Sequence, residues 1–127
     1  MTDYTIANLD EVEDLAASRG LDFGAVRFPR TAVDAERTGF AHLRILPDKH
    51  QSFGHRHQDA EEVYLVLSGS GAVKLDDGVH ELRTHDIVRL APHVTRCFAG
   101  GPDGIELLAF GPHHEKDGEL LQGYWES

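Results

Sequence analysis

The sequence predicts an all-β domain, either a β-sandwich or a β-barrel. Three observations predict it. Short apolar segments with period-two alternation recur from residue 40 onward. Turn-forming residues separate them at close spacing. The length of 127 residues fits one compact domain. We therefore expect a single domain over residues 1–127, with its barrel core at about 38–112 and a C-terminal tail at 113–127.

A short helix is expected before the strands, over residues 8–19. Asn8 can cap it, and Glu11 stands three residues later, as in a capping box. Gly20 follows as a C-terminal stop signal. The apolar stripe is narrow and the length is marginal for an isolated helix, so we expect this helix to lie on the barrel.

The expected strands share alternating apolar side chains and many β-branched or aromatic residues. They cover residues 40–46, 53–57, 63–67, 72–75, 79–83, 86–90, 95–99 and 105–110. The Asp-Asp-Gly sequence at 76–78 is a strong hairpin signal. We interpret the Gly-rich segments 68–71 and 100–104 as a turn and a loop. Tyr124 and Trp125 are costly to expose, so we expect them to dock on the barrel or on a partner chain.

The charge balance limits the class of partner. A net charge of −10, from 22 acidic and 12 basic residues, argues against nucleic acid or an anionic membrane as the main partner. No apolar run approaches the roughly 20 residues that span a bilayer, and the N-terminus lacks the regions of a signal peptide. The single cysteine, Cys97, excludes an intrachain disulfide. We expect a cytoplasmic protein that binds a small molecule.

His55, His57 and Glu62 form the most informative pattern in the chain. The two histidines stand two residues apart on an expected strand, so they point to the same face. Glu62 opens the next strand, and pairing of the two strands would bring its carboxylate to both imidazoles. Two histidines and one carboxylate form a facial ligand set with open positions. The set suits Fe, Mn, Co, Ni, Cu or Zn and does not distinguish among them.

Two segments resemble the motifs of the cupin family. In segment 54–69, a glutamate follows the second histidine by five residues and a glycine comes seven residues later, as in the first cupin motif. Segment 85–96 resembles the second motif. The resemblance covers roughly residues 40–110 and is closest to small single-domain bacterial cupins. It implies a double-stranded β-helix, a jelly-roll barrel with the site inside its mouth, and commonly a homodimer.

The second motif departs from the family pattern at its metal ligand. Arg96 stands where the resemblance implies the histidine that is the fourth ligand, and His93 stands at a glycine position. A guanidinium has no lone pair, so Arg96 cannot be a ligand. Two roles stay open for Arg96: a salt bridge to Glu62, or a bidentate grip on an anionic substrate beside the metal. His93 and His42 are the further candidates for a ligand.

Parity along the strands places the remaining candidates. Tyr64 shares the parity of Glu62, so we expect it inside, either as a core aromatic or as a general acid and hydrogen-bond donor to a substrate. Phe98 shares the parity of Arg96 and is expected to supply an apolar wall of the substrate site. Cys97 has the opposite parity and is expected to point away from the pocket.

Two functions are consistent with this pattern. The first is a metal-dependent oxygenase or isomerase acting on a small anionic organic substrate. The alternative is a non-catalytic small-ligand binding protein or sensor, with a Glu62–Arg96 salt bridge in place of the metal. Metal-free acid–base catalysis is a third reading, but the sequence shows no acid–base dyad beyond the triad itself.

Overall fold

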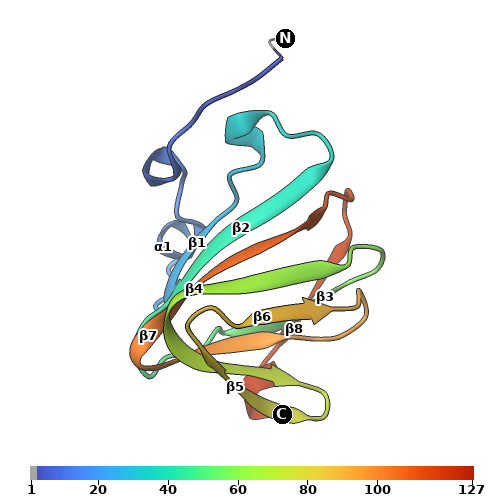
Figure 1. Ribbon diagram of the computed structural model, residues 1–127. Coiled ribbons are helices and arrows are strands. Elements are labelled where there is room, and N and C mark those ends of the chain that lie inside the picture. The colour runs from blue at the N-terminus through green and yellow to red at the C-terminus, as the bar shows by residue number, and fades with distance from the viewer. Residues whose placement is uncertain (1–2) are drawn as a thin grey trace.

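The computed structural model describes residues 3–127, and within that range the chain is mostly strand (Figure 1). The strands are β1 Gly24–Arg27, β2 Thr38–Ile45, β3 Phe53–His57, β4 Glu62–Leu75, β5 Gly78–Arg83, β6 Ile87–Leu90, β7 Cys97–Pro112 and β8 Gly118–Gln122. The larger sheet has the order β1-β2-β7-β4-β5, and β6 pairs with β4. β3 and β8 form the smaller sheet. Neighbouring strands pair antiparallel throughout.

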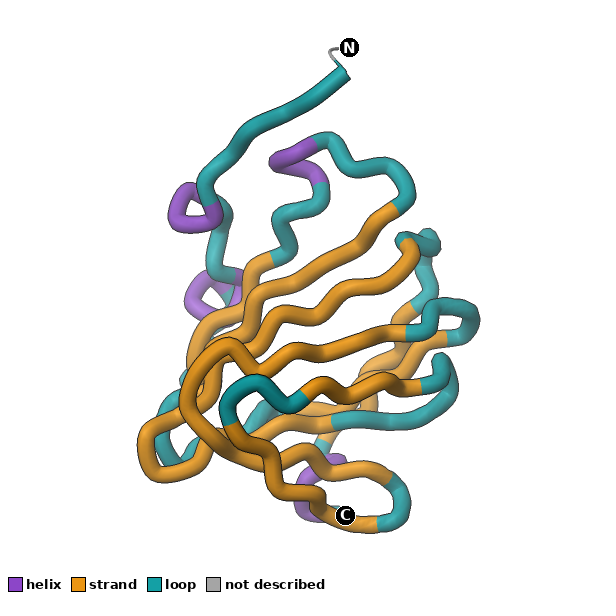
Figure 2. Tube along the Cα trace, in the orientation of Figure 1, coloured by secondary structure: helices purple, strands orange, loops and turns teal. Residues whose placement is uncertain are grey.

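The core lies between the two layers visible in Figure 2. Alternate residues of a strand point to one face, and on β2, β4 and β7 the inward residues are mostly apolar, with Glu62 of β4 an exception. The buried apolar ones are Ala41, Leu43, Ile45, Tyr64, Val66, Val73, Phe98, Ile105, Leu107 and Ala109. An isolated bridge from His55 of β3 to Arg96 connects the smaller sheet to the residue before β7, and a second bridge pairs His50 with Ala99 of β7. The expected all-β barrel is confirmed.

β4 and β7 are longer than the sequence indicated. The expected turn at 68–71 and the expected loop at 100–104 are wrong, because both segments lie inside these continuous strands. The β4–β7 register shifts between Val66 and Ser68 and again between Gly69 and Gly71, as at β-bulges. A Cβ at Gly71 would lie 2.0 Å from a backbone oxygen of β7. Glycine here bends one strand where two backbones approach closely, and it does not end the strand.

The expected helix over residues 8–19 is not continuous. It is divided into a 3₁₀ turn, η1 Leu9–Glu11, and one short helix, α1 Leu15–Ser18. The Asp14 carboxylate accepts hydrogen bonds from the backbone N–H groups of Ala16 and Val26, each at 3.0 Å. It therefore starts α1 and ties it to β1 at the same time. This tertiary contact outweighs a helix propensity that was marginal at this length.

Both ends of this N-terminal segment match their sequence signals. The Asn8 side chain accepts from the N–H of Asp10, and Gly20 follows α1 with a φ of 69°. α1 lies along β1 at one end of the barrel (Figure 1). A second 3₁₀ turn, η2 Thr31–Val33, connects β1 to β2.

The region after residue 112 is not a free tail. β8 pairs with β3 along its whole length, with His57 opposite Gly118. The last turn, η3 Tyr124–Glu126, packs below the barrel. The Tyr124 hydroxyl donates to Asp76, and the Trp125 ring stacks on His50 with ring centroids 5.3 Å apart. The prediction that these aromatics dock on the barrel is confirmed.

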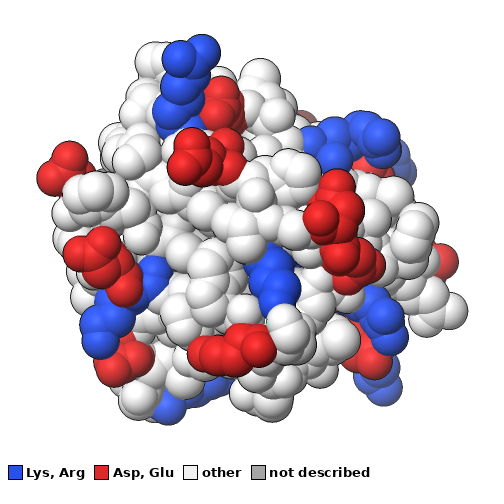
Figure 3. Space-filling model, turned by 90° about the horizontal axis from the view of Figure 1, so that it is seen from below, with Lys and Arg blue, Asp and Glu red and all other residues white. Residues whose placement is uncertain are grey.

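The surface carries both signs of charge. On the face seen from below, acidic and basic side chains are interspersed (Figure 3). None of the helices between residues 3 and 127 has the length and apolar character to cross a membrane.

Candidate metal site

His55, His57 and Glu62 converge inside the barrel. One ligand atom from each lies within 4.8 Å of the others. His55 Nε2 is 3.4 Å from Glu62 Oε1, and His57 Nε2 is 3.5 Å from Glu62 Oε2. The convergence was expected, but not through pairing of the two strands. β3 pairs with β8, and Glu62 reaches the histidines from β4 in the other sheet.

Asp117, which the sequence analysis did not single out, orients His57. Its carboxylate lies 3.2 Å from His57 Nδ1. It also accepts hydrogen bonds from the backbone N–H groups of Asp59 and Ala60. Burial raises the pKa of Asp117, but the backbone hydrogen bonds outweigh burial, so the net shift is downward. Asp117 is therefore an anion that accepts the Nδ1 proton of His57.

This hydrogen bond decides what the other nitrogen of His57 can do. With the proton on Nδ1, a neutral imidazole presents a lone pair at Nε2. His57 Nε2 is buried and has no hydrogen-bond partner, although a Glu62 oxygen lies 3.5 Å away. A lone pair facing a carboxylate is unfavourable unless a cation lies between them. The donor set therefore fits a divalent metal ion bound by His55, His57 and Glu62.

The other oxygen of Glu62, Oε1, is fixed by two hydrogen-bond donors. Oε1 accepts a hydrogen bond from the Tyr64 hydroxyl and a second one from Arg96 Nη1 at 3.2 Å. Burial raises the pKa of Glu62, but its polar contacts with His55, His57 and Tyr64 outweigh burial, and the net shift is downward. Burial lowers the pKa of His55. An ionised carboxylate and a neutral imidazole are the forms that bind a metal ion.

Tyr64 lines the cavity in front of the triad, as its parity predicts. Its hydroxyl lies 3.3 Å from His55 Nε2 and donates to Glu62. Burial and the neighbouring Glu62 charge raise the pKa of Tyr64 well above its usual value, so the hydroxyl keeps its proton. Phe98 packs against the Tyr64 ring, with centroids 4.5 Å apart. Phe98 is fully buried behind Tyr64 and is absent from the cavity wall.

Arg96 is placed for the first of its two expected roles. Its side chain is 0% exposed, donates to Glu62 and to the carbonyl of Ala91, and is absent from the cavity wall. The geometry therefore supports a salt bridge and does not support a grip on substrate. The salt bridge and a metal are compatible, because Arg96 binds Oε1 while His57 faces Oε2.

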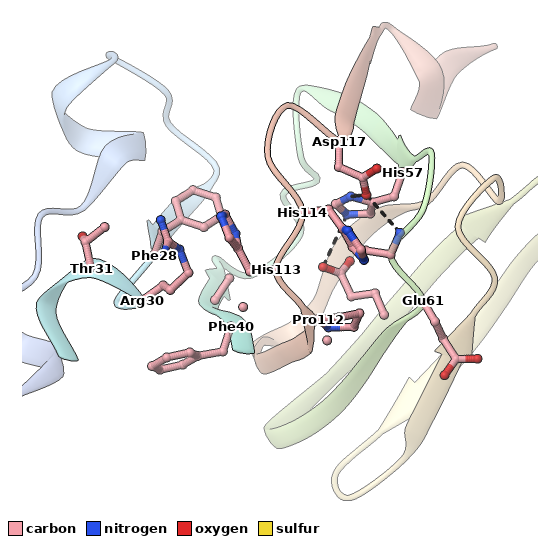
Figure 4. A pocket seen from close by; sticks show the side chains of 15 residues that line it. Phe28, Arg30, Thr31, Phe40, His57, Glu61, Pro112, His113, His114 and Asp117 are labelled. Atoms are coloured by element: carbon pink, nitrogen blue, oxygen red, sulfur yellow. Dashed lines mark hydrogen bonds and ion pairs between the residues drawn. The ribbon is translucent and has the colours of Figure 1, made fainter. Parts of the chain in front are cut away.

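Two cavities meet at the triad. One, the barrel cavity, has a volume of about 270 Å³. Its wall includes His55, His57, Glu62, Tyr64, Gln51, Arg19 and the apolar residues Leu15, Leu21, Val26, Phe28, Leu43, Phe53 and Leu120. The other, the side cavity, has about 340 Å³ and also touches His57 and Glu62. Figure 4 shows the side cavity with His57 and Asp117 on one side and Phe28, Arg30 and His113 on the other.

The two further ligand candidates lie away from the triad. His42 does not reach the triad: the inward residues of β2 are Ala41, Leu43 and Ile45, and His42 contacts Glu106 on the other face of the strand. His93 is exposed in the turn after β6. Neither is part of the histidine and carboxylate group found in the described chain.

Cys97 does not line either cavity at the triad, as its parity predicts. The residue is 0% exposed, and its Sγ lies 3.5 Å from the carbonyl oxygen of Gln51. Burial raises the pKa of the thiol to about 12. Such a thiol is not a nucleophile at neutral pH.

Comparison with known sequences gives a remote relationship. No family model matches the chain. An uncharacterized protein of Methanocaldococcus jannaschii (MJ1618) is 27% identical over 81 residues, which are 61% of this chain. The chain spans about 65% of the length of that relative.

Solved structures give a clear fold. A cupin protein from Bacteroides fragilis (BF4112) matches with a TM-score of 0.71 at 20% identity, over 91% of this chain and 89% of that one. The polyketide cyclase RemF from Streptomyces resistomycificus matches with a TM-score of 0.74 at 18% identity, over 97% and 86% of the two chains. An oxalate decarboxylase variant from Bacillus subtilis matches with 0.74 at 16% identity, over 95% of this chain and 33% of that one. The chain therefore adopts the cupin fold, as its two sequence motifs predict.

Proposed function

We propose that the protein is an enzyme that uses a divalent transition metal on His55, His57 and Glu62 to act on a small organic anion, as an oxygenase or an isomerase. One observation carries the proposal. His57 Nε2 is a buried atom without a hydrogen-bond partner that lies 3.5 Å from Glu62 Oε2, while Asp117 contacts the other ring nitrogen. A metal ion satisfies the lone pair and the carboxylate together.

The chain's own residues support this chemistry in separate ways. A metal bound here supplies a Lewis acid to an oxygen-bearing substrate. Asp117 keeps His57 in the tautomer that binds it. The Tyr64 hydroxyl holds the Glu62 carboxylate and keeps its proton, so at the cavity wall it supports the role of hydrogen-bond donor rather than that of general acid. The apolar wall of the barrel cavity excludes water around the substrate.

The alternative function, a non-catalytic binding protein, has its own support. Arg96 already supplies a buried cation to Glu62 at 3.2 Å. A second proton on His57 would satisfy Glu62 Oε2 without a metal. In that state the barrel cavity holds a ligand next to a neutralised, metal-free carboxylate.

Metal analysis separates the two functions. Protein produced without a histidine tag is incubated with Mn²⁺, Fe²⁺, Co²⁺, Ni²⁺, Cu²⁺ or Zn²⁺, dialysed and analysed by mass spectrometry. The expected result is about one ion per chain in wild type and none in Glu62→Gln. A variant with His113 and His114 both changed to alanine removes the adjacent surface pair and keeps the full stoichiometry. An ion lost in that control and retained in Glu62→Gln would contradict the proposal.

Ligand binding and turnover then separate an enzyme from a binding protein. Small organic acids that raise the melting temperature identify candidates, because a ligand that binds the native state stabilises it by mass action. The enzyme reading expects metal-dependent consumption of one of them, followed by proton NMR. A ligand that binds and is never converted, with or without metal, supports the binding protein instead.

A further inference from the structure

The barrel cavity carries a cation, Arg19, that no sequence motif indicated. Arg19 stands at the C-terminal end of α1 and contributes to the cavity wall. It is the one Lys or Arg among the described residues that line this cavity. The residue is exposed as well as cavity-lining, which places it at the rim.

The guanidinium of Arg19 is not engaged elsewhere. Within residues 3–127 it takes part in no ion pair and no side-chain hydrogen bond. Arg96 and Arg30, the arginines beside the triad and the side cavity, are both engaged. Arg96 is bound to Glu62 and Ala91 behind the triad. Arg30, on the side cavity, donates to the carbonyl of Ala35. Arg19 is therefore the arginine of the three whose fork is free to bind a ligand.

The rest of the barrel cavity favours a small and mostly apolar ligand. Its volume of about 270 Å³ lies just below the roughly 300–1,000 Å³ usual for drug-sized ligands. Polar groups gather at the triad, while Leu15, Leu21, Phe28 and Leu120 contribute to an apolar wall. A sugar would leave several hydroxyls without partners against such a wall.

From this arrangement we infer that Arg19 selects the substrate class: a small carboxylic acid with an apolar aliphatic or aromatic body. The carboxylate pairs with Arg19 at the rim, and the body extends along the apolar wall towards His55, His57 and Glu62. The inference rests on the proposed function for the metal end, but the pairing with Arg19 does not need the metal. Arginine suits this role because its planar fork can donate two parallel hydrogen bonds to a carboxylate.

The position of Arg19 has a structural cause. The Asp14 carboxylate ties α1 to β1, and the N–H of Leu21 donates to the carbonyl of Ala16 at 2.8 Å, closing the helix end. These contacts hold Leu15, Arg19 and Leu21 on the same cavity. The N-terminal segment thus contributes both apolar wall and the cation.

The test compares carboxylates with their own amides. The probes are phenylacetate, hexanoate and 4-hydroxybenzoate, each beside its primary amide, titrated calorimetrically into EDTA-treated protein and again into Zn²⁺-loaded protein. The variants are Arg19→Gln and Arg19→Lys. Arg83→Gln is the matched control, since it removes the same charge from a side chain that is 89% exposed and absent from the barrel cavity. Melting temperatures verify that all variants fold.

At least one carboxylate is expected to bind wild type more tightly than its amide. Arg19→Gln should weaken the affinity for that carboxylate about three- to tenfold. This loss lies between those expected for a solvent-exposed ion pair and for a desolvated one. Amide binding should stay unchanged, Arg19→Lys should recover part of the loss, and Arg83→Gln should match wild type. The inference fails if every carboxylate binds no better than its amide, or if Arg19→Gln and Arg83→Gln behave alike. If the protein takes up no Zn²⁺, the metal proposal fails. If Arg19→Gln still weakens carboxylate binding in that metal-free protein, the inference about Arg19 stands.

Discussion

Two histidines in this barrel each face a carboxylate, one at the triad and one outside the core. His57 Nδ1 lies 3.2 Å from Asp117, and His42 Nε2 lies 2.7 Å from Glu106. Each ring also has one buried nitrogen without a hydrogen-bond partner, Nε2 in His57 and Nδ1 in His42. By residue type and burial alone, the two are equivalent candidates for a metal ligand.

The surroundings of the free nitrogen separate them. His57 Nε2 faces the Glu62 carboxylate, and its ring lines both cavities. His42 lines neither of them, and its carboxylate partner already accepts from two further side chains. A metal site therefore needs convergence of donors that are not otherwise satisfied, and a buried histidine paired with a carboxylate is not sufficient.

The largest expected effect separates these two histidines directly. His57→Ala should abolish stoichiometric metal binding, because two remaining ligands do not form the facial set. His42→Ala should bind metal as wild type does. Isothermal titration with Zn²⁺ measures both. Equal losses in the two variants would mean that the ion binds elsewhere or that both changes unfold the chain, and a circular dichroism melt distinguishes those cases.

The next effect concerns the arginines beside the two carboxylates. Arg96→Met should destabilise the metal-free protein by about 3–5 kcal/mol, because Glu62 stays buried without its cation. Arg44 binds Glu106 from a side chain that is 56% exposed, so Arg44→Met should cost only about 0–1 kcal/mol. Urea unfolding monitored by tryptophan fluorescence measures both. Similar midpoints for the two variants would show that the Glu62–Arg96 pair is not buried in solution.

A smaller effect is expected at the carboxylates that orient the rings. Asp117→Asn should weaken metal binding about 10- to 100-fold, the usual size for loss of a group that orients a ligating histidine. Glu106→Gln should leave metal affinity unchanged. Competition with a chelating dye gives both constants. An unaltered affinity in Asp117→Asn would remove Asp117 from the metal site.

The last prediction is that the Cys97 thiol of the native protein hardly reacts with a disulfide reagent. Cys97 is buried and the pKa of its thiol is about 12. At pH 8, a disulfide reagent should modify the native protein at least about a hundredfold more slowly than the urea-unfolded chain, because thiolate and access are both limiting. A rapid reaction of the native protein would show that this part of β7 opens.

The homodimer expected from the family resemblance also stays a prediction, which light scattering can test.

Local patterns in the sequence predicted the site's centre. His55 and His57 share a strand face, Glu62 and Tyr64 share another, and period-two parity needs no knowledge of distant contacts. The same parity was insufficient for His42, since an isolated histidine does not show which face is inward. The apolar residues on either side of it, Ala41 and Leu43, carried the correct signal.

Non-local contacts could not be predicted in the same way. Asp117 lies 60 residues from His57 along the chain, and the segment around it has no strong strand pattern. The arginine at the cavity rim, Arg19, depends on how α1 is tied to β1. The glycines 69 and 71 give the same local signal for a turn as for a β-bulge. Which one forms is decided by the close approach of β7.

An anomalous difference map of crystals grown with Mn²⁺ or Zn²⁺ tests the central claim most directly. We predict one strong peak per chain at about 2.0–2.3 Å from His55 Nε2, His57 Nε2 and a Glu62 oxygen, with the Asp117 contact to His57 Nδ1 intact. A barrel without a peak, in which His57 donates a hydrogen bond from Nε2 to Glu62 while an ion occupies only the His113–His114 pair, would contradict it.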